Sequence, residues 1–395
     1  MLKELTEKVE LKKPEIIDAL SELIRIKALS PENGGDGELE KAEYLVGLLD
    51  GFEVKRYDAK DRRAKKGTRP NIVAKIEGKI DRTLWIVTHL DVVPEGDLLL
   101  WKTPPFEPII KDGKIYGRGS EDNGQSIVSS LFAAKVIKES DKIPNYSFGV
   151  VFVSDEEVGS KYGIQHLLQQ NIFRKDDLII VPDAGDPKGD KIEIAEKGIL
   201  WLKFTVKGVQ AHASKPAGIN AAREAARFLI DVDTSLHKKF KKKNALFNPP
   251  ISTFEPTKRE KNVDNVNTIP GLDISYIDCR IIPDYDIDDV IDYVYEIKKN
   301  YSSVDVEVIQ KESSPLTPPD SEVVRLLSRA IEILRGVKPN VYGVGGNTCA
   351  AFFRKAGFHT AVWSTVDGTA HQPNEYAVID NIIKDAKVFA VLPFL

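Results

Sequence analysis

Side chains that commonly bind metal ions follow three apolar runs of this chain. LWIVT leads into His89, FGVVFVS leads into the acidic triplet Asp155–Glu157, and LIIVP leads into Asp183. We expect each run to be a buried strand, so that these groups stand at the carboxyl edge of a sheet, where open α/β sheets place their ligands. The pattern therefore predicts a metal-binding edge.

Two further residues complete the predicted ligand set. Asp122 stands in YGRGSEDN, ahead of the helix-like stretch QSIVSSLFAAKVIKE, and His371 stands in DGTAHQPNE. An aspartate can bind one ion with each oxygen, which a two-metal site needs because its ions lie about 3.5–4 Å apart. With one glutamate of the acidic triplet, the set comprises two histidines and three carboxylates, which suit a pair of zinc ions; cobalt or manganese can substitute.

Each of these residues also has a purely structural interpretation. Asp91 lies two residues after His89 on the predicted strand and can either hold the second ring nitrogen of His89 or cap the strand end. Asp122 can cap the following helix, and the acidic triplet can be a surface turn. In the metal interpretation one of Glu156 and Glu157 binds an ion while the other stays free as a general base. Because five such residues from separate segments coincide, we favour the metal site.

Composition excludes several classes of partner. With a formal net charge of -4 and 29% charged residues, the chain shows no sign of binding nucleic acid or an anionic membrane. Its N-terminal segment lacks a secretory signal, and no apolar run approaches the length of a membrane span. Cys279 and Cys349 cannot form a disulfide framework, so we expect a cytoplasmic protein. The basic run Lys238–Lys243 is interpreted as a solvated loop.

The first part of the chain alternates strands and helices. Strands are expected at NIVAKIEG, TLWIVTHLDV, FGVVFVSDEE and DLIIVPDA, with helices at 14–26, 38–50, 125–139 and 161–170. This alternation predicts a layered α/β domain with a mostly parallel sheet. The same alternation is expected again near the C-terminus, with helices at 320–335 and 347–356 and the strand TAVWST.

Between these two parts the order of the expected strands and helices changes. LWLKFTVKG, a helix at 219–231, ISTFEP, LDISYIDCRI, a helix at 286–299 and VDVEVI follow in the order βαββαβ, which is the split ferredoxin-like arrangement. We therefore predict a discontinuous catalytic domain, residues 1–198 and 310–395, interrupted by an inserted lid, residues 199–309.

Seven motifs follow one another in an order typical of one family: THLDVVP, GRGSED, SDEEVGS, GVQAHASKPAGINAA, NTIPG, DCRIIP and AHQPNE. Over essentially its whole length the chain resembles the dizinc peptidase and deacylase family of acetylornithine deacetylase, succinyl-diaminopimelate desuccinylase, glutamate carboxypeptidase and aminoacylase. The resemblance implies a zinc domain with an inserted ferredoxin-like lid that often mediates dimerisation, hence a homodimer. GRGSEDNGQS departs from the pattern, because many members carry a lysine after this segment, which leaves the subfamily open.

The resemblance also implies how the metals are held. One zinc ion is expected on His89 and Asp183 and the other on Glu157 and His371, with Asp122 bridging the two. The family pattern further implies a cis peptide bond after Asp122.

Other positions take supporting roles by the same resemblance. Asp91 would orient His89, Glu156 would be the general base, and His212 of the lid would polarise the scissile carbonyl, often from the partner subunit. Substrate-binding positions are implied at Asn267 and Arg280, where a guanidinium can pair with a carboxylate, and at Gly346, Asn347 and Thr348 ahead of a helix. A purely structural interpretation stays open for all of these lid and loop positions.

These expectations define a function. The first choice is hydrolysis of the amide bond of an N-acyl amino acid, with water activated by two metal ions and deprotonated by Glu156. The alternative is a metallopeptidase, either a carboxypeptidase or a dipeptidase, acting on short peptides. A remote third possibility is a non-catalytic binding protein on this scaffold, which the complete ligand set disfavours.

Overall fold

The computed structural model describes residues 1–313 and 315–395, and the chain divides into two compact units. The first comprises Met1–Ile194, Thr317–Val341 and Thr348–Leu395, and the second comprises Ala195–Leu316 and Tyr342–Asn347. Among the described residues, none of the helices combines the length and the apolar character needed to span a bilayer.

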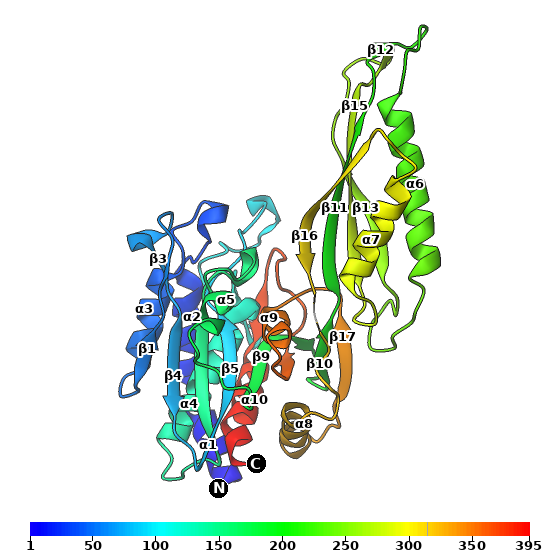
Figure 1. Cartoon of the computed structure of the whole chain (residues 1–395). Coiled ribbons are helices and arrows are strands. Elements are labelled where there is room, and N and C mark those ends of the chain that lie inside the picture. The colour runs from blue at the N-terminus through cyan, green and yellow to red at the C-terminus, as the bar shows by residue number, and fades with distance from the viewer. Residues whose placement is uncertain (314) are drawn as a thin grey trace. The chain divides into compact units, whose positions relative to one another are not determined.

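The first unit is built on the larger sheet (Figure 1). Its eight strands lie in the order β1 (Val54–Arg56), β4 (Ile72–Ile76), β8 (Tyr146–Val153), β5 (Ile80–His89), β9 (Leu178–Asp186), β18 (Thr360–Thr365), β10 (Lys191–Glu196) and β17 (Asn340–Val344). The neighbours β8, β5, β9 and β18 run parallel, as predicted, whereas β1, β4 and β10 pair antiparallel with their neighbours. Two small sheets flank them: β2 (Ala59–Lys60) with β3 (Thr68–Arg69), and β6 (Ile109–Lys111) with β7 (Lys114–Tyr116) and β19 (Tyr376–Val378).

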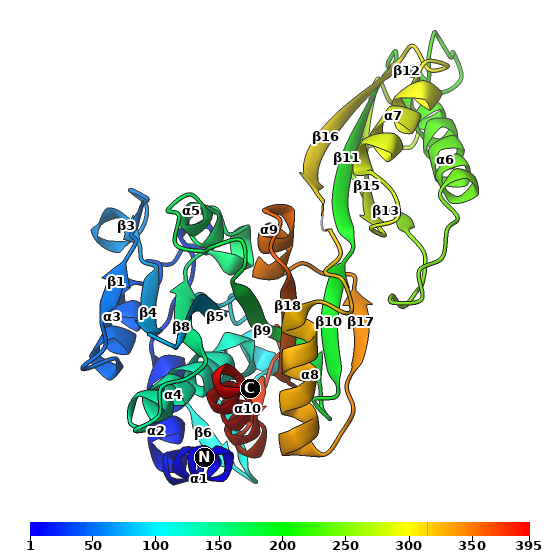
Figure 2. The ribbon, with the colours of Figure 1, turned by 60° about the horizontal axis from the view of Figure 1, so that its bottom comes forward.

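Helices cover both faces of this sheet. They are α1 (Leu2–Leu11), α2 (Lys13–Arg25), α3 (Leu39–Leu48), α4 (Gln125–Lys138), α5 (Ile164–Leu168), α8 (Glu322–Arg335), α9 (Cys349–Lys355) and α10 (Ile379–Val391). Helix α4 packs on β5 and α10 (Figure 2), while Trp85 and Val87 of β5 join a core cluster with α5 and α9. Because β5 is buried on both faces, its sequence is a continuous apolar run rather than an alternating one.

The main sheet of the second unit is antiparallel and is covered by helices on one face. Its strands lie in the order β13 (Thr253–Arg259), β15 (Leu272–Ile281), β11 (Gly198–Lys207) and β16 (Val304–Glu312), with helices α6 (Ala221–Lys239) and α7 (Ile287–Lys298) on one side (Figure 1). Leu202 and Phe204 of β11 are buried under the helices, whereas Trp201 on the opposite face is exposed. This alternation is typical of a half-buried sheet, and the order agrees with the predicted βαββαβ arrangement.

Candidate metal centre

Two groups of potential metal ligands lie side by side in the first unit and share one residue. His89, Asp122 and Asp183 place their ligand atoms within 4.8 Å of one another, and so do Asp122, Glu157 and His371. We call them the strand triad and the loop triad. The five residues predicted as ligands are therefore brought together from five separate segments of the chain.

Asp122 lies between the two histidines. Its Oδ1 is 2.8 Å from Nε2 of His89, and its Oδ2 is 3.0 Å from Nε2 of His371. Glu157 Oε2 lies 3.1 Å from the same nitrogen of His371, and Asp183 Oδ1 lies 3.4 Å from Nε2 of His89. Each oxygen of one carboxylate thus faces a different triad, which is the geometry that a bridging ligand requires.

His89 is the last residue of β5 and is buried. Its Nδ1 lies 3.1 Å from the main-chain oxygen of Asp91 and 3.5 Å from the Asp91 carboxylate. A carbonyl oxygen can only accept, so Nδ1 carries the proton and Nε2 keeps its lone pair for a metal ion. The predicted support of His89 by Asp91 therefore comes foremost from the main chain, and Asp91 itself lies beyond the end of the strand.

Asp183 lies within β9, whereas the sequence suggested the end of a strand. The neighbouring strand β18 pairs with β9 at Val181 and next at Gly185, so the register shifts around Asp183. Strand β9 continues after this shift. Asn123 donates to Asp183 Oδ1 at 2.8 Å, which ties this bulge to the segment that carries Asp122. The peptide bond between Asp122 and Asn123 is cis, which confirms the prediction made for it.

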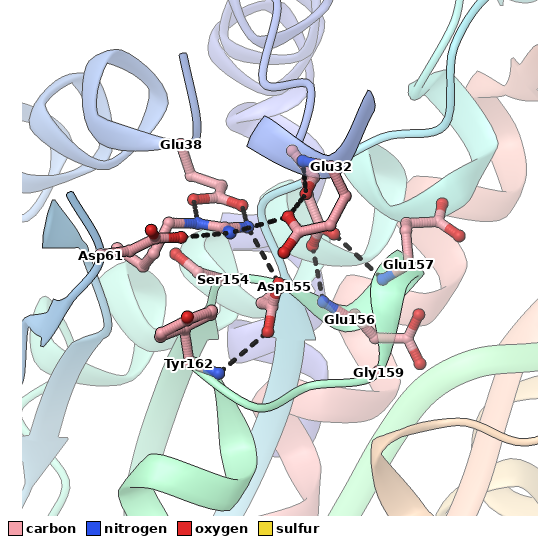
Figure 3. Close-up of polar contacts among 12 residues, drawn as sticks. Glu32, Glu38, Asp61, Ser154, Asp155, Glu156, Glu157, Gly159 and Tyr162 are labelled. Atoms are coloured by element: carbon pink, nitrogen blue, oxygen red, sulfur yellow. Dashed lines mark hydrogen bonds and ion pairs between the residues drawn. The ribbon is translucent and has the colours of Figure 1, made fainter. Parts of the chain in front are cut away.

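The acidic triplet forms a turn that separates its three carboxylates. Asp155 has a positive φ of 71°, and Glu156–Val158 form one 3-10 turn. Figure 3 shows the Asp155 side chain on the side of Glu38 and Asp61, and the Glu156 and Glu157 side chains on the other side of the turn. Glu157 belongs to the loop triad, and Glu156 lies near enough to Asp183 and His89 to feel their charges, whereas Asp155 forms an ion pair with the buried Arg69.

Two residues hold this turn in place. The Asp91 carboxylate accepts the backbone N–H groups of Glu156 and Glu157, each at 3.0 Å. Asp155 pairs at 3.2 Å with the fully buried Arg69, which also donates to Glu38. Sequence reasoning did not find Arg69, because an isolated arginine next to a proline carries no motif.

Burial and like charge raise the pKa values of both glutamates. Burial raises the pKa of Glu157 to about 7, assisted by the negative charge of Asp122. Burial, followed by the charge of Asp183, raises the pKa of Glu156 well above its usual range. Crowded carboxylates of this kind are stabilised by a cation. Glu157 Oε1 is buried without a hydrogen-bond partner among the described residues, so the donor set fits metal ions.

The predicted lid residues lie in the second unit. His212 belongs to the short ribbon of β12 (Ala211–His212) and β14 (Thr268–Ile269). Asn267 directly precedes β14, and its main-chain oxygen accepts the N–H of Ala213 at 2.9 Å. His212 and Asn267 are therefore close together. Nδ1 of His212 accepts the backbone N–H of Ser214 at 3.1 Å, so its proton is on Nε2.

Arg280 and the glycine-rich segment meet within the same unit. Arg280 donates to the carbonyl oxygen of Gly345 at 3.2 Å and pairs with Asp278 at 2.8 Å. Gly346 and Asn347 follow directly, and the Thr348 hydroxyl caps α9 by accepting the N–H of Ala350 at 3.1 Å. The predicted catalytic His212 thus lies with the predicted substrate-binding Asn267, and Arg280 lies with Gly345, directly ahead of the predicted positions Gly346 and Asn347.

Two buried glutamates beside the ligands also escaped sequence reasoning. Glu121 precedes Asp122, and Glu375 follows His371 by four residues. Both carboxylates accept backbone N–H groups from the other one's segment. Backbone donors leave no trace in the sequence; the one available signal was an acidic residue next to a predicted ligand.

The chain is similar to several known proteins over most of its length. A model of peptidase family M20/M25/M40 matches residues 85–393. An uncharacterized metallohydrolase of Methanocaldococcus jannaschii is 44% identical over 400 residues, which cover 95% of this chain and 98% of the relative. A succinyl-diaminopimelate desuccinylase of Nautilia profundicola is 28% identical over 384 residues, covering 95% and 97%. A solved M20 family metallo-carboxypeptidase of Sulfolobus solfataricus is 21% identical with a TM-score of 0.76, covering 96% and 100%, and therefore shares the fold.

Proposed function

The chain belongs to peptidase family M20/M25/M40, and from that premise we propose that it hydrolyses the amide bond of N-acyl amino acids with two zinc ions. It is a metal-dependent hydrolase of peptide or amide bonds. The acyl amino acid is proposed as substrate because the chain is similar along almost its whole length to a desuccinylase, which removes an acyl group.

The observation that carries the proposal is the position of Asp122. Its two oxygens lie 2.8 Å and 3.0 Å from the histidines of two different triads. We propose His89 and Asp183 as ligands of one ion, Glu157 and His371 as ligands of the other, and Asp122 as the bridge. When bound, such a pair of ions activates water and polarises the amide carbonyl.

Glu156 is proposed as the general base. It directly precedes Glu157 in the same turn and lies within range of the charges of Asp183 and Glu157, but it belongs to neither triad, so its carboxylate stays available to a proton. Burial and the charge of Asp183 raise its pKa, which brings the carboxylate nearer to the working range of a proton-transfer group. Glu156 would accept a proton from the attacking water and deliver it to the leaving amine nitrogen.

His212 is proposed to polarise the substrate carbonyl. Because Nδ1 accepts the N–H of Ser214, the exposed ring presents Nε2–H as a donor. A neutral imidazole donor stabilises an oxygen on which negative charge develops. Arg280, Asn267 and the segment from Gly346 to Thr348 are proposed to bind the substrate carboxylate. The second unit would then act as a lid, and we propose a homodimer in which His212 serves either its own subunit or its partner.

A substrate panel tests this proposal. The zinc-loaded protein is offered acetylornithine, succinyl-diaminopimelate and other N-acyl amino acids, alongside dipeptides and peptides with a C-terminal glutamate. Zinc-loaded Glu156→Gln is the matched control for contaminating activity. We expect turnover of acyl amino acids that carry a free carboxylate. Turnover of peptides alone would establish a metallopeptidase instead, and no turnover of either class would favour a binding protein.

A further inference from the structure

Two loops of the first unit hold each other through buried carboxylates. The bridge loop, residues 117–124, carries Glu121 and the bridging candidate Asp122. The histidine loop, residues 366–376, carries His371 and Glu375. Glu121 is 4% exposed and Glu375 is 0% exposed, although neither faces a metal triad as a ligand. A carboxylate is expensive to bury unless its lone pairs are satisfied, so the partners of these two residues are informative.

Glu121 binds the histidine loop along its backbone. Its carboxylate accepts the N–H groups of four consecutive residues, with distances of 2.7 Å to Asp367, 3.2 Å to Gly368 and 2.9 Å to Ala370, and a further contact to Thr369. The Thr369 hydroxyl donates as well, at 2.9 Å. Residues 367–370 are thereby fixed immediately ahead of His371.

Glu375 makes the reciprocal contact. It accepts the N–H groups of Gly119 at 3.0 Å, Glu121 at 2.9 Å and Asp122 at 3.0 Å, and the guanidinium of Arg118 at 2.7 Å. The backbone of the bridging candidate is therefore anchored from the histidine loop. Each loop thus donates backbone amides to the glutamate of the other.

His371 needs such an anchor more than the other candidate ligands do. It has a positive φ of 62°, and its side chain is 55% exposed, so packing does little to hold the ring. A metal ligand whose position is not fixed loses conformational freedom on binding, which weakens the metal site.

We propose that Glu121 and Glu375 are positioning residues that hold the loop triad and the bridge in metal-binding geometry. Glu121 acts through His371, so its loss weakens the ion of the loop triad. Glu375 acts through Asp122, so its loss weakens both ions. The inference rests on the proposed ligand set, and it concerns two residues that belong to neither triad.

Metal titration of the stripped protein tests the assignment. Zinc affinity is measured by competition with a chelator for wild type, Glu121→Gln and Glu375→Gln. Glutamine keeps the shape, but its amide nitrogen would face N–H donors. We expect Glu121→Gln to bind one of two ions about 10–100-fold more weakly, the range typical for residues that support metal ligands, and Glu375→Gln to weaken both.

A matched control separates positioning from general stability. Asp177 is also buried and accepts the backbone N–H of Thr83 and the indole N–H of Trp85, but at the opposite end of β5 and β9 from the metal centre. Asp177→Asn is expected to lower the melting temperature while both zinc affinities stay within about threefold of wild type, because it supports no ligand. If Glu121→Gln does not fold, Thr369→Val takes its place. This variant removes one hydroxyl donor to Glu121, and we expect a milder loss of zinc affinity at the loop triad.

A double variant makes the assignment falsifiable. If Glu121 acts through His371, then adding Glu121→Gln to His371→Ala should not weaken the remaining ion further. Wild-type zinc affinities in both Glu121→Gln and Thr369→Val would overturn the inference, and so would equal weakening of both ions in Glu121→Gln. Failure of the wild type to bind two ions would instead contradict the ligand set on which the proposed function depends.

Discussion

The strand triad and the loop triad share Asp122 but are built in opposite ways. His89 and Asp183 lie on central strands, and their side chains are 2% and 9% exposed. His371 comes from a loop and is 55% exposed, and Glu157 comes from a turn that Asp91 anchors. A site on strands is held by the sheet itself, whereas a site on loops depends on added contacts. We therefore expect the strand triad to bind its ion more tightly.

The largest effect should come from removing the shared residue. Asp122→Ala is expected to weaken both ions by more than the roughly 10–100-fold caused by losing a supporting residue, and to abolish turnover. Metal analysis after gel filtration at fixed zinc concentration measures the stoichiometry. A variant that kept one ion at wild-type affinity would show that Asp122 serves a single triad.

Removing the proposed base should separate binding from chemistry. Glu156→Ala is expected to keep both ions and the fold but to lower turnover by about 10²–10⁴-fold, the usual contribution of a general base. Zinc analysis and kinetics on the same preparation test this. If the variant loses an ion, the roles of Glu156 and Glu157 have been exchanged.

The contrast between the triads can be measured directly with His371→Ala. This variant is expected to lose affinity at the loop triad by on the order of a hundredfold while the strand triad keeps its ion, because the two histidines contact different oxygens of Asp122. His89→Ala is the mirror variant. Equal loss of both ions in His371→Ala would mean that the two triads do not bind independently.

The smallest effect per step is the pH dependence of zinc affinity at the loop triad. Hydrogen bonds to Asp122 and Glu157 raise the pKa of His371 to about 10, and burial together with the charge of Asp122 raises the pKa of Glu157 to about 7. An ion must displace the His371 proton at neutral pH, so zinc affinity at the loop triad should rise about tenfold per pH unit from 7 to 9 and more steeply below 7. Chelator competition in His89→Ala isolates this triad. A flat profile would contradict the expectation.

Much of the site was predictable because its chemistry depends on residue type. Histidine and carboxylate at the ends of buried strands indicated His89 and the turn of Glu156 and Glu157, and the motif order placed His371 with them. Asp183 was predicted as a ligand because it was expected at the end of a strand. In the structure β9 bulges at Asp183 and continues. A bulge arises from pairing with a neighbouring strand that lies far away in the sequence, so local patterns cannot reveal it.

What the sequence determined by itself was the inventory: the strand-forming runs, the candidate ligands, and the βαββαβ order of the second unit. What only the tertiary structure decided was which carboxylates lie in the two triads and which accept backbone N–H groups or an arginine. Asp155 turns inward to Arg69, Glu121 and Glu375 accept amides from each other's loops, and Asp122 faces two histidines. The reason is physical: a carboxylate accepts from any donor within reach, and which donors lie within reach is set by contacts between segments that are distant in the sequence.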